Sequence, residues 1–303
     1  MFFGYSMLGK MGELGNQMFQ YATLYALCED RGCEGLVPDT DIELYSAFPN
    51  LSLKKCSKKE MLENLQWVYD HPESFDFAYN KNVKMLQSRA DLRGYFQSVL
   101  YFINHRKSIV NEFQFREDIK AVCTKEYNRI ANEAKTEDLC VIHFRRGDYL
   151  EKSHFHYNLN WQNYYVEALS SMLKSKPNMR FVVFSDDYQW CRENVPTDFI
   201  FHNMKDQYHD LCLMSMFQNH IIANSSFSWW GAYLSGDAWS TNVIAPSIWF
   251  GPQGPKNWNT IYCPGWQLMG PKMTNPLYQL MNLKKPDDVG RLLQILLYPL
   301  APS

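Results

Sequence analysis

The sequence predicts an α/β protein of two domains, with a doubly wound parallel sheet in the second. The chain of 303 residues is longer than a single minimal core requires. In its second half, apolar runs alternate with amphipathic stretches, a pattern typical of parallel strands joined by crossover helices. A strand, a glycine-rich turn and a helix open the first half. We place the boundary after residue 135, which gives domains of residues 1–135 and 136–303.

The N-terminal segment predicts one strand and one helix. Residues 2–8 form a short apolar strand, and the glycine-rich residues 9–17 form the turn that follows it. Residues 18–29 then predict a helix that Gly32 ends. From residue 36 to about residue 135 the hydrophobic pattern is irregular and predicts no definite order of elements.

The second half begins with a buried strand at 139–144, followed by an amphipathic helix over 161–174 with Asn160 as its N-cap. Further strands are expected at 180–184, 199–201, 220–223 and 242–245, and further helices at 188–194, 206–218 and 227–235. Ligands of such sheets bind outside the carboxyl ends of the strands. The loops that begin at Arg145, Ser185 and Asn224 are therefore expected to converge on one crevice. The last residues are expected to form a helical tail.

The bulk composition excludes several classes of protein. The net charge of -2 and the pI near 6.4 provide no general field for nucleic acid or anionic lipid, so affinity for phosphate requires a local site. No run of about 18 apolar residues occurs, and the N-terminus lacks the pattern of a signal peptide, so no transmembrane segment is expected. The eight cysteines are scattered without a C-x-x-C pair and predict reduced, mostly buried thiols.

Two arginines follow directly after the strand at 139–144, in the stretch HFRRGDY over residues 143–149. The guanidinium groups of Arg145 and Arg146 are rigid forks that can hold a diphosphate through charge-assisted, bidentate hydrogen bonds. The alternative is a salt-bridged loop in which Asp148 holds one of the two arginines.

Two carboxylates follow the next strand, at Asp186 and Asp187. A carboxylate at this position could accept hydrogen bonds from the N1 and N2 edge of guanine, which would favour GDP over UDP. The alternative is helix capping, because aspartate at the start of a helix accepts hydrogen bonds from free backbone N–H groups. A third option is that one of the two is the cap while the other contacts the base.

A third polar cluster follows the apolar residues 221–223 and opens a helix. Asn224, Ser225, Ser226 and Phe227 place hydroxyl groups and free backbone amides at one point, an arrangement suited to an anion such as a nucleotide phosphate. The alternative is an ordinary N-cap.

Other nucleotide and metal motifs are absent from the sequence. Residues 12–17 do not form a G-x-G-x-x-G fingerprint, and no P-loop motif occurs, so nicotinamide and ATP chemistry are not supported. Asp39 and Asp41 form a D-x-D pattern, but it lies in an irregular region after Pro38 and is interpreted as a loop or a cap. No metal and no cofactor is therefore expected.

Together, residues 12–22, 143–149, 185–187 and 224–233 resemble the α-1,2-fucosyltransferase family, glycosyltransferase family 11. The similarity spans about residues 5–235, and its most specific element is the H-x-R-R-G-D-Y pattern of residues 143–149. Residues 92–98 also resemble a stretch of this family. The resemblance implies a GT-B-type glycosyltransferase, with two Rossmann-like halves facing a cleft. It further implies inverting transfer of L-fucose from GDP-fucose, a substrate held mainly by the C-terminal half, to the 2-OH of a galactose without a metal.

The resemblance also implies roles for individual residues. Arg145 would neutralise the β-phosphate of the leaving GDP, and Asn16 would lie near the donor and the acceptor. The general base is left open between Asp148, which we favour, Glu13, His156 and a phosphate oxygen of the donor. The expected donor-binding residues are His143, Arg146, Asp186, Asp187, Asn224, Ser225, Ser226, Phe227 and Gly15.

Several alternatives remain at this point. They are a fucosyltransferase of another linkage or acceptor, including protein O-fucosylation, a metal-dependent transferase of another nucleotide sugar, and a non-catalytic GDP-sugar-binding module. The expected partners are GDP-fucose and a galactose-terminated oligosaccharide or glycoconjugate, with no nucleic acid. Since the chain starts almost at its first strand, it resembles microbial members without an anchor. We expect it in the cytoplasm, including the periphery of a membrane, or in the Golgi lumen if it is a trimmed catalytic domain.

Overall fold

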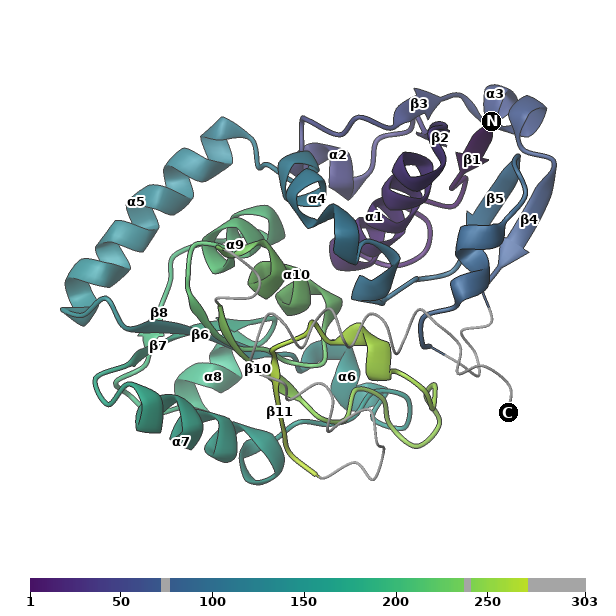
Figure 1. The fold of residues 1–303 in the computed structure, drawn as a ribbon. Coiled ribbons are helices and arrows are strands. Elements are labelled where there is room, and N and C mark those ends of the chain that lie inside the picture. Colours follow the sequence, from purple (N-terminus) through teal and green to yellow (C-terminus); the bar gives the residue numbers. More distant parts are fainter. Residues whose placement is uncertain (72–76, 237–240, 272–303) are drawn as a thin grey trace. The chain divides into compact units, whose positions relative to one another are not determined.

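The computed structural model describes residues 1–71, 77–236 and 241–271 (Figure 1). The chain divides into two compact units. Unit 1 consists of Met1–Ile119 and Pro255–Ile261, and unit 2 consists of Lys120–Gly254 and Tyr262–Ser303. The helical tail expected at the C-terminus lies outside the described residues.

The division falls earlier in the chain than the boundary expected after residue 135. Most of helix α5 (Glu117–Ala134) belongs to unit 2 because its side chains contact other elements of that unit. The Cys123 thiol donates a hydrogen bond to the carbonyl of His209 at 3.3 Å, and the Tyr127 ring packs on Phe217 at 5.1 Å between centroids.

Unit 1 contains a parallel sheet in the order β3-β2-β1-β5-β4. Its strands are β1 (Phe2–Gly4), β2 (Glu34–Pro38), β3 (Lys54–Cys56), β4 (Trp67–Asp70) and β5 (Ala90–Arg93). Its helices are α1 (Leu14–Arg31), α2 (Glu43–Ala47), α3 (Lys58–Asn64) and α4 (Arg106–Glu112), and the short 3-10 helices are η1 (Lys81–Met85), η2 (Val99–Tyr101), η3 (Ile103–His105) and η5 (Asn259–Ile261).

Helices cover both faces of this sheet. The side chains of successive strand residues point to opposite faces. On β2, α1 approaches Gly35 through Leu24, whereas Met61 of α3 packs with Leu36. The two helices therefore lie on opposite faces, as in other open parallel sheets.

Helix α1 begins four residues before the start expected from the sequence. The carbonyl of Glu13 accepts hydrogen bonds from the backbone of Asn16 and Gln17, so residues 14–17 form the first turn despite Gly15. Its end matches the prediction, because Gly32 adopts the left-handed conformation (φ 56°) and its N–H caps the last turn.

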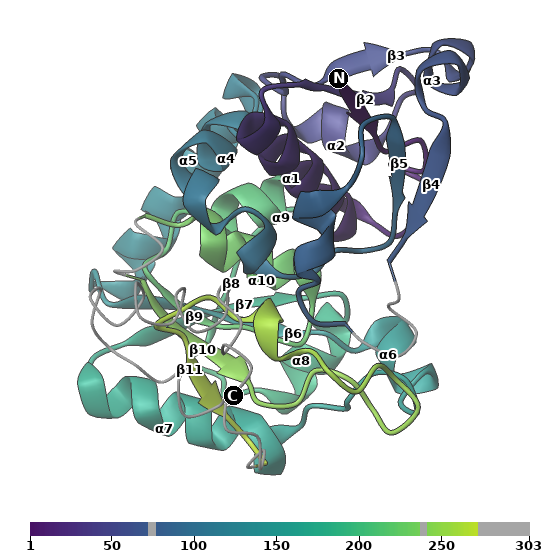
Figure 2. The ribbon, with the colours of Figure 1, turned by 45° about the vertical axis from the view of Figure 1, so that its right-hand side comes forward.

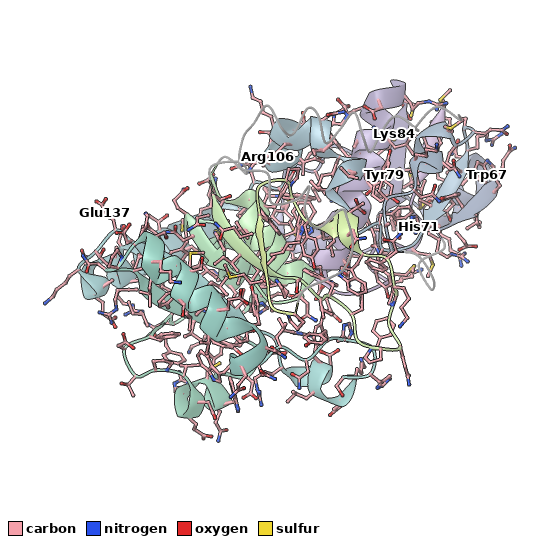
Figure 3. All side chains as sticks on the ribbon, turned by 60° about the horizontal axis from the view of Figure 1, so that its bottom comes forward. Trp67, His71, Tyr79, Lys84, Arg106 and Glu137 are labelled. Carbon is pink, nitrogen blue, oxygen red and sulfur yellow. The ribbon has the colours of Figure 1, made fainter. Side chains whose placement is uncertain are left out.

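An aromatic cluster lies beside β4 and β5 in unit 1. The Tyr79 and Tyr101 rings are 4.9 Å apart, and the His71 and Tyr101 rings are 6.1 Å apart and nearly perpendicular (His71 and Tyr79 are labelled in Figure 3). The His71 Nε2 atom also lies 2.7 Å from the Tyr101 hydroxyl group. These edge-to-face contacts hold together the loops that follow the two strands.

Unit 2 contains a parallel sheet in the order β11-β10-β9-β6-β7-β8. Its strands are β6 (Leu139–Phe144), β7 (Arg180–Ser185), β8 (Ile200–Phe201), β9 (Asn219–Ile221), β10 (Asn242–Pro246) and β11 (Gln267–Met269). Besides α5, its helices are α6 (Gly147–Glu151), α7 (Val166–Ser175), α8 (Tyr188–Asn194), α9 (Gln207–Met214) and α10 (Ser226–Leu234). Helices α7 and α8 cover one face, and α9 and α10 cover the other (Figures 1 and 2).

The predicted doubly wound sheet is confirmed, with differences at the ends of elements. The helix expected at 161–174 begins as a wider turn, η4 (Trp161–Tyr165), and Asn160 caps it as predicted. Helix α9, expected to reach residue 218, ends at Met214. The N–H groups of Met216 and Phe217 bond to carbonyls only three residues back, which turns the chain toward β9. Strand β11 was not predicted, since three residues at a sheet edge give too short a pattern.

Candidate active site

The three predicted loops lie at the carboxyl edge of the sheet in unit 2. From β6 the chain winds outward through β7 and β8, and it then returns to β9 on the other side of β6. The order of the strands therefore reverses between β6 and β9, and such a reversal is where open α/β sheets bind ligands. Hydrogen bonds join the loops, because Arg146 N–H donates to Asp186 at 2.9 Å and the Tyr149 hydroxyl donates to the Asn224 carbonyl at 3.1 Å.

Arg145 lies at the centre of these loops between two carboxylates. Its Nη2 atom is 2.8 Å from Asp148 Oδ1, and its Nη1 atom is 3.0 Å from Asp186 Oδ2. The guanidinium also lies over the Tyr149 ring, 5.2 Å from its centroid. The side chain is 31% exposed, so its N–H groups are accessible to a ligand as well as to the carboxylates. The salt-bridged alternative considered for this loop is therefore present in the structure.

Arg146 has a different environment. Its guanidinium stacks on the Trp190 ring at 3.7 Å, and its Nε atom is 3.3 Å from Asp187 Oδ2. This contact with an aromatic face fixes the side chain against the start of α8. The structure thus separates the two arginines, with Arg146 anchored and Arg145 between carboxylates.

The two carboxylates after β7 also differ. Asp187 Oδ1 accepts a hydrogen bond from Trp190 N–H at 3.0 Å, so Asp187 is the N-cap of α8. Both oxygens of Asp186 contact the loop after β6. One accepts a hydrogen bond from Arg146 N–H, and the other pairs with the Arg145 guanidinium. A Cβ atom on Gly147 would lie 2.6 Å from Asp186 Oδ2, so this close approach requires glycine.

Asn224 connects three loops through its side chain. Its Nδ2 atom donates to the carbonyls of Tyr157 at 2.9 Å and Trp249 at 2.7 Å, which uses both amide hydrogens. Ser225 is the N-cap of α10 and accepts a hydrogen bond from Phe227 N–H at 3.3 Å. The half-buried Ser226, at the first residue of the helix, is the member of this cluster best placed for a ligand.

His143 lies near the end of β6 and faces α10, with its ring 6.3 Å from the Phe227 ring. The side chain is buried. Burial, together with the positive charge of Arg145, lowers the pKa of His143 to about 3, so the imidazole is neutral at physiological pH. Its buried Nδ1 atom makes no hydrogen bond within the described ranges.

The predicted site residues of unit 1 lie at the amino end of α1. Glu13 is exposed at the N-cap position, and Gly15 is buried in the first turn. Asn16 is partly buried, and its Oδ1 atom accepts a hydrogen bond from Gln97 Nε2 in the loop after β5. Sequence reasoning did not single out Gln97, although it lies in the 92–98 stretch noted for its family resemblance.

Comparison with known proteins identifies the family. The family model described as "Glycosyl transferase family 11" matches residues 7–269. The chain belongs to glycosyltransferase family 11. This membership confirms the resemblance based on residues 143–149, and it establishes that the protein is a glycosyltransferase.

Curated relatives of this family 11 enzyme include two proteins of Escherichia coli. The O-antigen biosynthesis glycosyltransferase WbnK is 29% identical, over 79% of this chain and 93% of the relative. An alpha-1,2-colitosyltransferase is 30% identical, over 79% of this chain and 90% of the relative. Galactoside alpha-(1,2)-fucosyltransferase 1 of Bos taurus is 25% identical, over 74% of this chain and 65% of the relative.

Two solved structures to which the enzyme is similar are of fucosyltransferases. NodZ alpha-1,6-fucosyltransferase soaked with GDP-fucose aligns with a TM-score of 0.43 at 10% identity, over 77% of this chain and 92% of that one. POFUT1 in complex with GDP-fucose aligns with a TM-score of 0.46 at 11% identity, over 89% of this chain and 98% of that one. The α/β class with two Rossmann-like halves is confirmed by the two parallel sheets of the enzyme itself.

Two candidates for the general base of the glycosyltransferase lie in unit 2. Burial raises the pKa of Asp148, but the charges of Arg145 and Lys152 outweigh this effect and lower it overall, so the carboxylate is ionised at neutral pH. His156 stacks on Tyr149 with parallel rings 3.8 Å apart, and burial lowers its pKa to about 4. Near neutral pH both groups are therefore in the form that can accept a proton, as a general base must.

The two aspartates considered for a metal lie in unit 1. Asp39 and Asp41 are exposed between β2 and α2. Among residues 1–71, 77–236 and 241–271, no group of three or more His, Cys, Asp or Glu side chains is arranged to hold a metal ion. All eight cysteines are free, and all but Cys33 are buried, as predicted. None of the helices in the described part of the chain has the length and apolar character needed to span a membrane.

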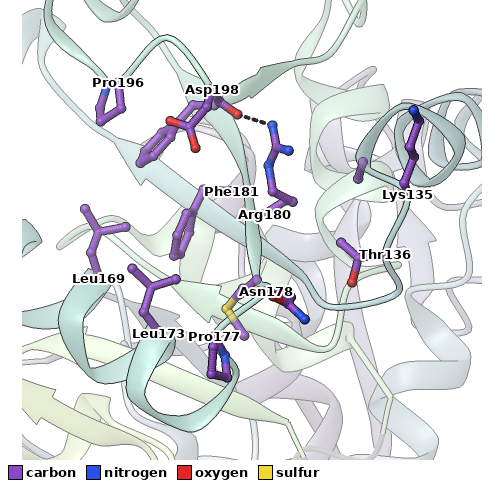
Figure 4. Close-up of a pocket in the computed structure, with 13 residues that line it drawn as sticks. Lys135, Thr136, Leu169, Leu173, Pro177, Asn178, Arg180, Phe181, Pro196 and Asp198 are labelled. Atoms are coloured by element: carbon purple, nitrogen blue, oxygen red, sulfur yellow. Dashed lines mark hydrogen bonds between the residues drawn. The ribbon is translucent and has the colours of Figure 1, made fainter.

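A hollow of about 630 Å³ lies at the opposite edge of the sheet in unit 2 (Figure 4). Residues that precede β6 and β7 line it, including Lys135, Thr136 and Asn178. Leu169 and Phe181 form part of its apolar wall. It contains none of the predicted site residues, which lie at the carboxyl edge instead.

Proposed function

We propose that this family 11 glycosyltransferase transfers L-fucose from GDP-β-L-fucose to the 2-OH of a galactose, with inversion at the anomeric carbon. The observation that carries the proposal is the position of Arg145 at the carboxyl end of β6, where the strand order reverses. A partly exposed guanidinium at this point is suited to the phosphate from which the sugar departs.

In the proposed reaction, the galactose O2 atom forms a bond to C1 of fucose as the bond from C1 to the β-phosphate oxygen breaks. The electron pair of that bond leaves with GDP, and the negative charge that develops on the diphosphate must be stabilised. Arg145 supplies positive charge directly, and the amino end of α10 with Ser226 supplies N–H groups. A metal ion is not needed for this step, which makes metal independence part of the proposal.

The proton of the acceptor hydroxyl passes to a base on the side opposite the phosphate. We assign this role to Asp148, whose carboxylate is ionised near neutral pH and partly exposed. Because Asp148 is already engaged with Arg145, the alternative is a dissociative reaction, in which the acceptor hydroxyl loses its proton to a phosphate oxygen of the departing GDP instead of to a base on the opposite side. Glu13 and His156 remain further candidates.

Guanine recognition is assigned to His143 and to the Asp186–Asp187 pair. The imidazole of His143 is neutral, so it can donate or accept a hydrogen bond but carries no charge that would attract a phosphate. Asp187 caps α8 through one oxygen and pairs with Arg146 through the other, and Asp186 pairs with Arg145, so in this proposal guanine shares these partly exposed carboxylates with the two arginines. Asn224 and Arg146 support these loops through the contacts described above.

A second candidate donor is a nucleotide-activated colitose. This reading is favoured by the alpha-1,2-colitosyltransferase of Escherichia coli, which is 30% identical, whereas the α-1,2-fucosyltransferase of Bos taurus is 25% identical. Both names specify an α-1,2 linkage, so the acceptor position proposed here is common to the two candidates.

The test is transfer to a β-galactoside such as N-acetyllactosamine, with GDP-fucose and activated colitose as competing donors and EDTA present. NMR of the product gives the linkage. We expect α-1,2-linked fucose. Colitose in the product would show that activated colitose is the donor instead of GDP-fucose. A linkage other than α-1,2, or transfer to a protein instead of the galactoside, would contradict the proposed acceptor. Product only after Mn²⁺ is added would contradict metal independence. GDP binding without any transfer would indicate a non-catalytic module.

A further inference from the structure

The loop after β5 contains a strained residue. Phe96 has a φ of 52°, in the left-handed region that a bulky side chain rarely adopts. Its buried ring packs against Tyr5 at 6.0 Å, His71 at 5.0 Å and Tyr101 at 5.5 Å, measured between centroids. These contacts hold the backbone in a conformation that it would not keep alone, and strain of this kind concentrates at functional sites.

The strained turn places Gln97 against Asn16. Gln97 is buried, and its Nε2 atom donates a hydrogen bond to Asn16 Oδ1. Gln97 follows β5 and Asn16 follows β1, and these two strands are neighbours in the sheet of unit 1. From β1 the chain winds outward through β2 and β3, and it returns on the other side through β4 and β5. The amide pair therefore lies at the reversal of strand order in unit 1.

The glycine-rich loop is shaped around the same amide. Gly12 has a φ of 81°, and a Cβ atom on it would lie 2.2 Å from Asn16 Nδ2. The loop thus has no room for a side chain at position 12, because it would collide with the Asn16 side chain. With Gln97 bound to the oxygen, the Asn16 amide has one orientation, in which its nitrogen faces the exposed loop.

We infer that Gln97 is a positioning residue that holds the Asn16 amide so that its nitrogen donates a hydrogen bond to an oxygen atom of the sugar substrate. The inference rests on the proposed function and on the family resemblance, which implies that Asn16 lies near the donor and the acceptor. Sugar hydroxyl oxygens accept hydrogen bonds readily, and an amide that is free to turn would offer its carbonyl half of the time. In the structure Gln97 presents its Nε2 atom to the Asn16 oxygen, which leaves the Asn16 nitrogen as the atom for the substrate.

Kinetics with GDP-fucose and a β-galactoside test the positioning role. Gln97→Ala is expected to lower kcat/KM on the order of 10²-fold, mainly through kcat, because the amide is no longer oriented. Gln97→Glu can only accept from Asn16, which turns the amide around, so its loss should be at least as large. In the background of Asn16→Ala, either change should have no further effect. Gln114→Ala, which removes a side-chain amide that donates to the Val110 carbonyl of α4, is the matched control and should behave as wild type.

A second readout does not depend on turnover. In protein labelled with ¹⁵N-asparagine, the Asn16 side-chain NH₂ signals are assigned by their loss in Asn16→Ala. They should shift in Gln97→Ala and Gln97→Glu but not in Gln114→Ala. If the wild type transfers no fucose while these signals respond, the proposed function is wrong and the positioning contact stands. Unmoved Asn16 signals in Gln97→Glu, or losses that multiply in the double variant, would overturn the inference.

Discussion

Replacing Arg145 with alanine is expected to remove turnover while leaving unit 2 folded. The change takes away the positive charge between Asp148 and Asp186 and both terminal N–H groups that face them. Removing one preorganised donor from a developing oxyanion lowers kcat by about 10²–10³-fold. Because Arg145 offers two such groups and a full charge, we expect a loss of at least about 10³-fold, or about 4 kcal/mol in activation free energy.

The expected effect on stability is small. The side chains of Arg145, Asp148 and Asp186 are 31%, 39% and 23% exposed, so water screens their ion pairs. Pairs of this kind contribute about 0–1 kcal/mol to the free energy of unfolding. The melting temperature should therefore change little, which separates a catalytic loss from unfolding.

The assay measures initial rates of fucose transfer at saturating acceptor, together with GDP affinity by calorimetry and the melting temperature. Arg145→Lys keeps the charge but not the planar fork, so its rate should lie between wild type and Arg145→Ala. Arg180→Ala is the matched control, because Arg180 lines the hollow at the opposite edge of the sheet. Near-normal transfer by a folded Arg145→Ala variant would falsify the assignment of the phosphate to this residue.

Three other changes test the surrounding groups. Trp190→Leu removes the aromatic face under Arg146, a contact of about 1 kcal/mol, so GDP should bind about fivefold more weakly in calorimetry; unchanged affinity would contradict a supporting role for Arg146 at the donor. Asp210→Asn tests a partly buried carboxyl whose pKa is raised to about 7 by desolvation. Because the folded pKa lies above the unfolded value, stability is full below about pH 4 and falls by up to about 4 kcal/mol as pH rises from about 4 to about 7. The variant should therefore melt higher than wild type at pH 8 but not at about pH 4, and equal melting temperatures at pH 8 would refute the shift. Asn224→Ala leaves two backbone carbonyls without their partner and should cost about 2–3 kcal/mol of stability at near-normal kcat/KM. A selective loss of GDP affinity would instead assign Asn224 to the donor.

The arrangement of the site was predictable because it depends on strand order and periodicity. Alternation of apolar runs with amphipathic stretches placed Arg145, Asp186 and Asn224 at the same edge of the sheet, and hydrogen bonds in the structure join their loops. The identity of each side-chain partner was not predictable in the same way. Whether an aspartate caps a helix or contacts a base depends on the orientation of one carboxylate, which the local sequence does not specify.

The contacts that sequence reasoning missed come from tertiary structure. Trp190 approaches Arg146 from a helix more than forty residues further along the chain, and Gln97 approaches Asn16 from the loop after β5, 81 residues away. The left-handed conformation of Phe96 is imposed by packing against three other aromatic rings, and no local pattern indicates it. The early start of helix α1 has a local cause instead, since backbone hydrogen bonds to the Glu13 carbonyl form the first turn despite the low helix propensity of Gly15.

The carboxylates beside Arg145 are compatible with a phosphate site because their hold on the guanidinium is weak. Each ion pair is partly exposed and screened by water, so it contributes little free energy. Breaking one of them to bind a diphosphate therefore also costs little free energy. A diphosphate brings more negative charge than a single carboxylate, and in the proposed complex it would also face the amino end of α10. Asp148 also pairs with Lys152 at 3.2 Å, so it keeps a cationic partner if Arg145 turns toward the donor. The two carboxylates can therefore orient the guanidinium before the donor binds and release it when the diphosphate arrives.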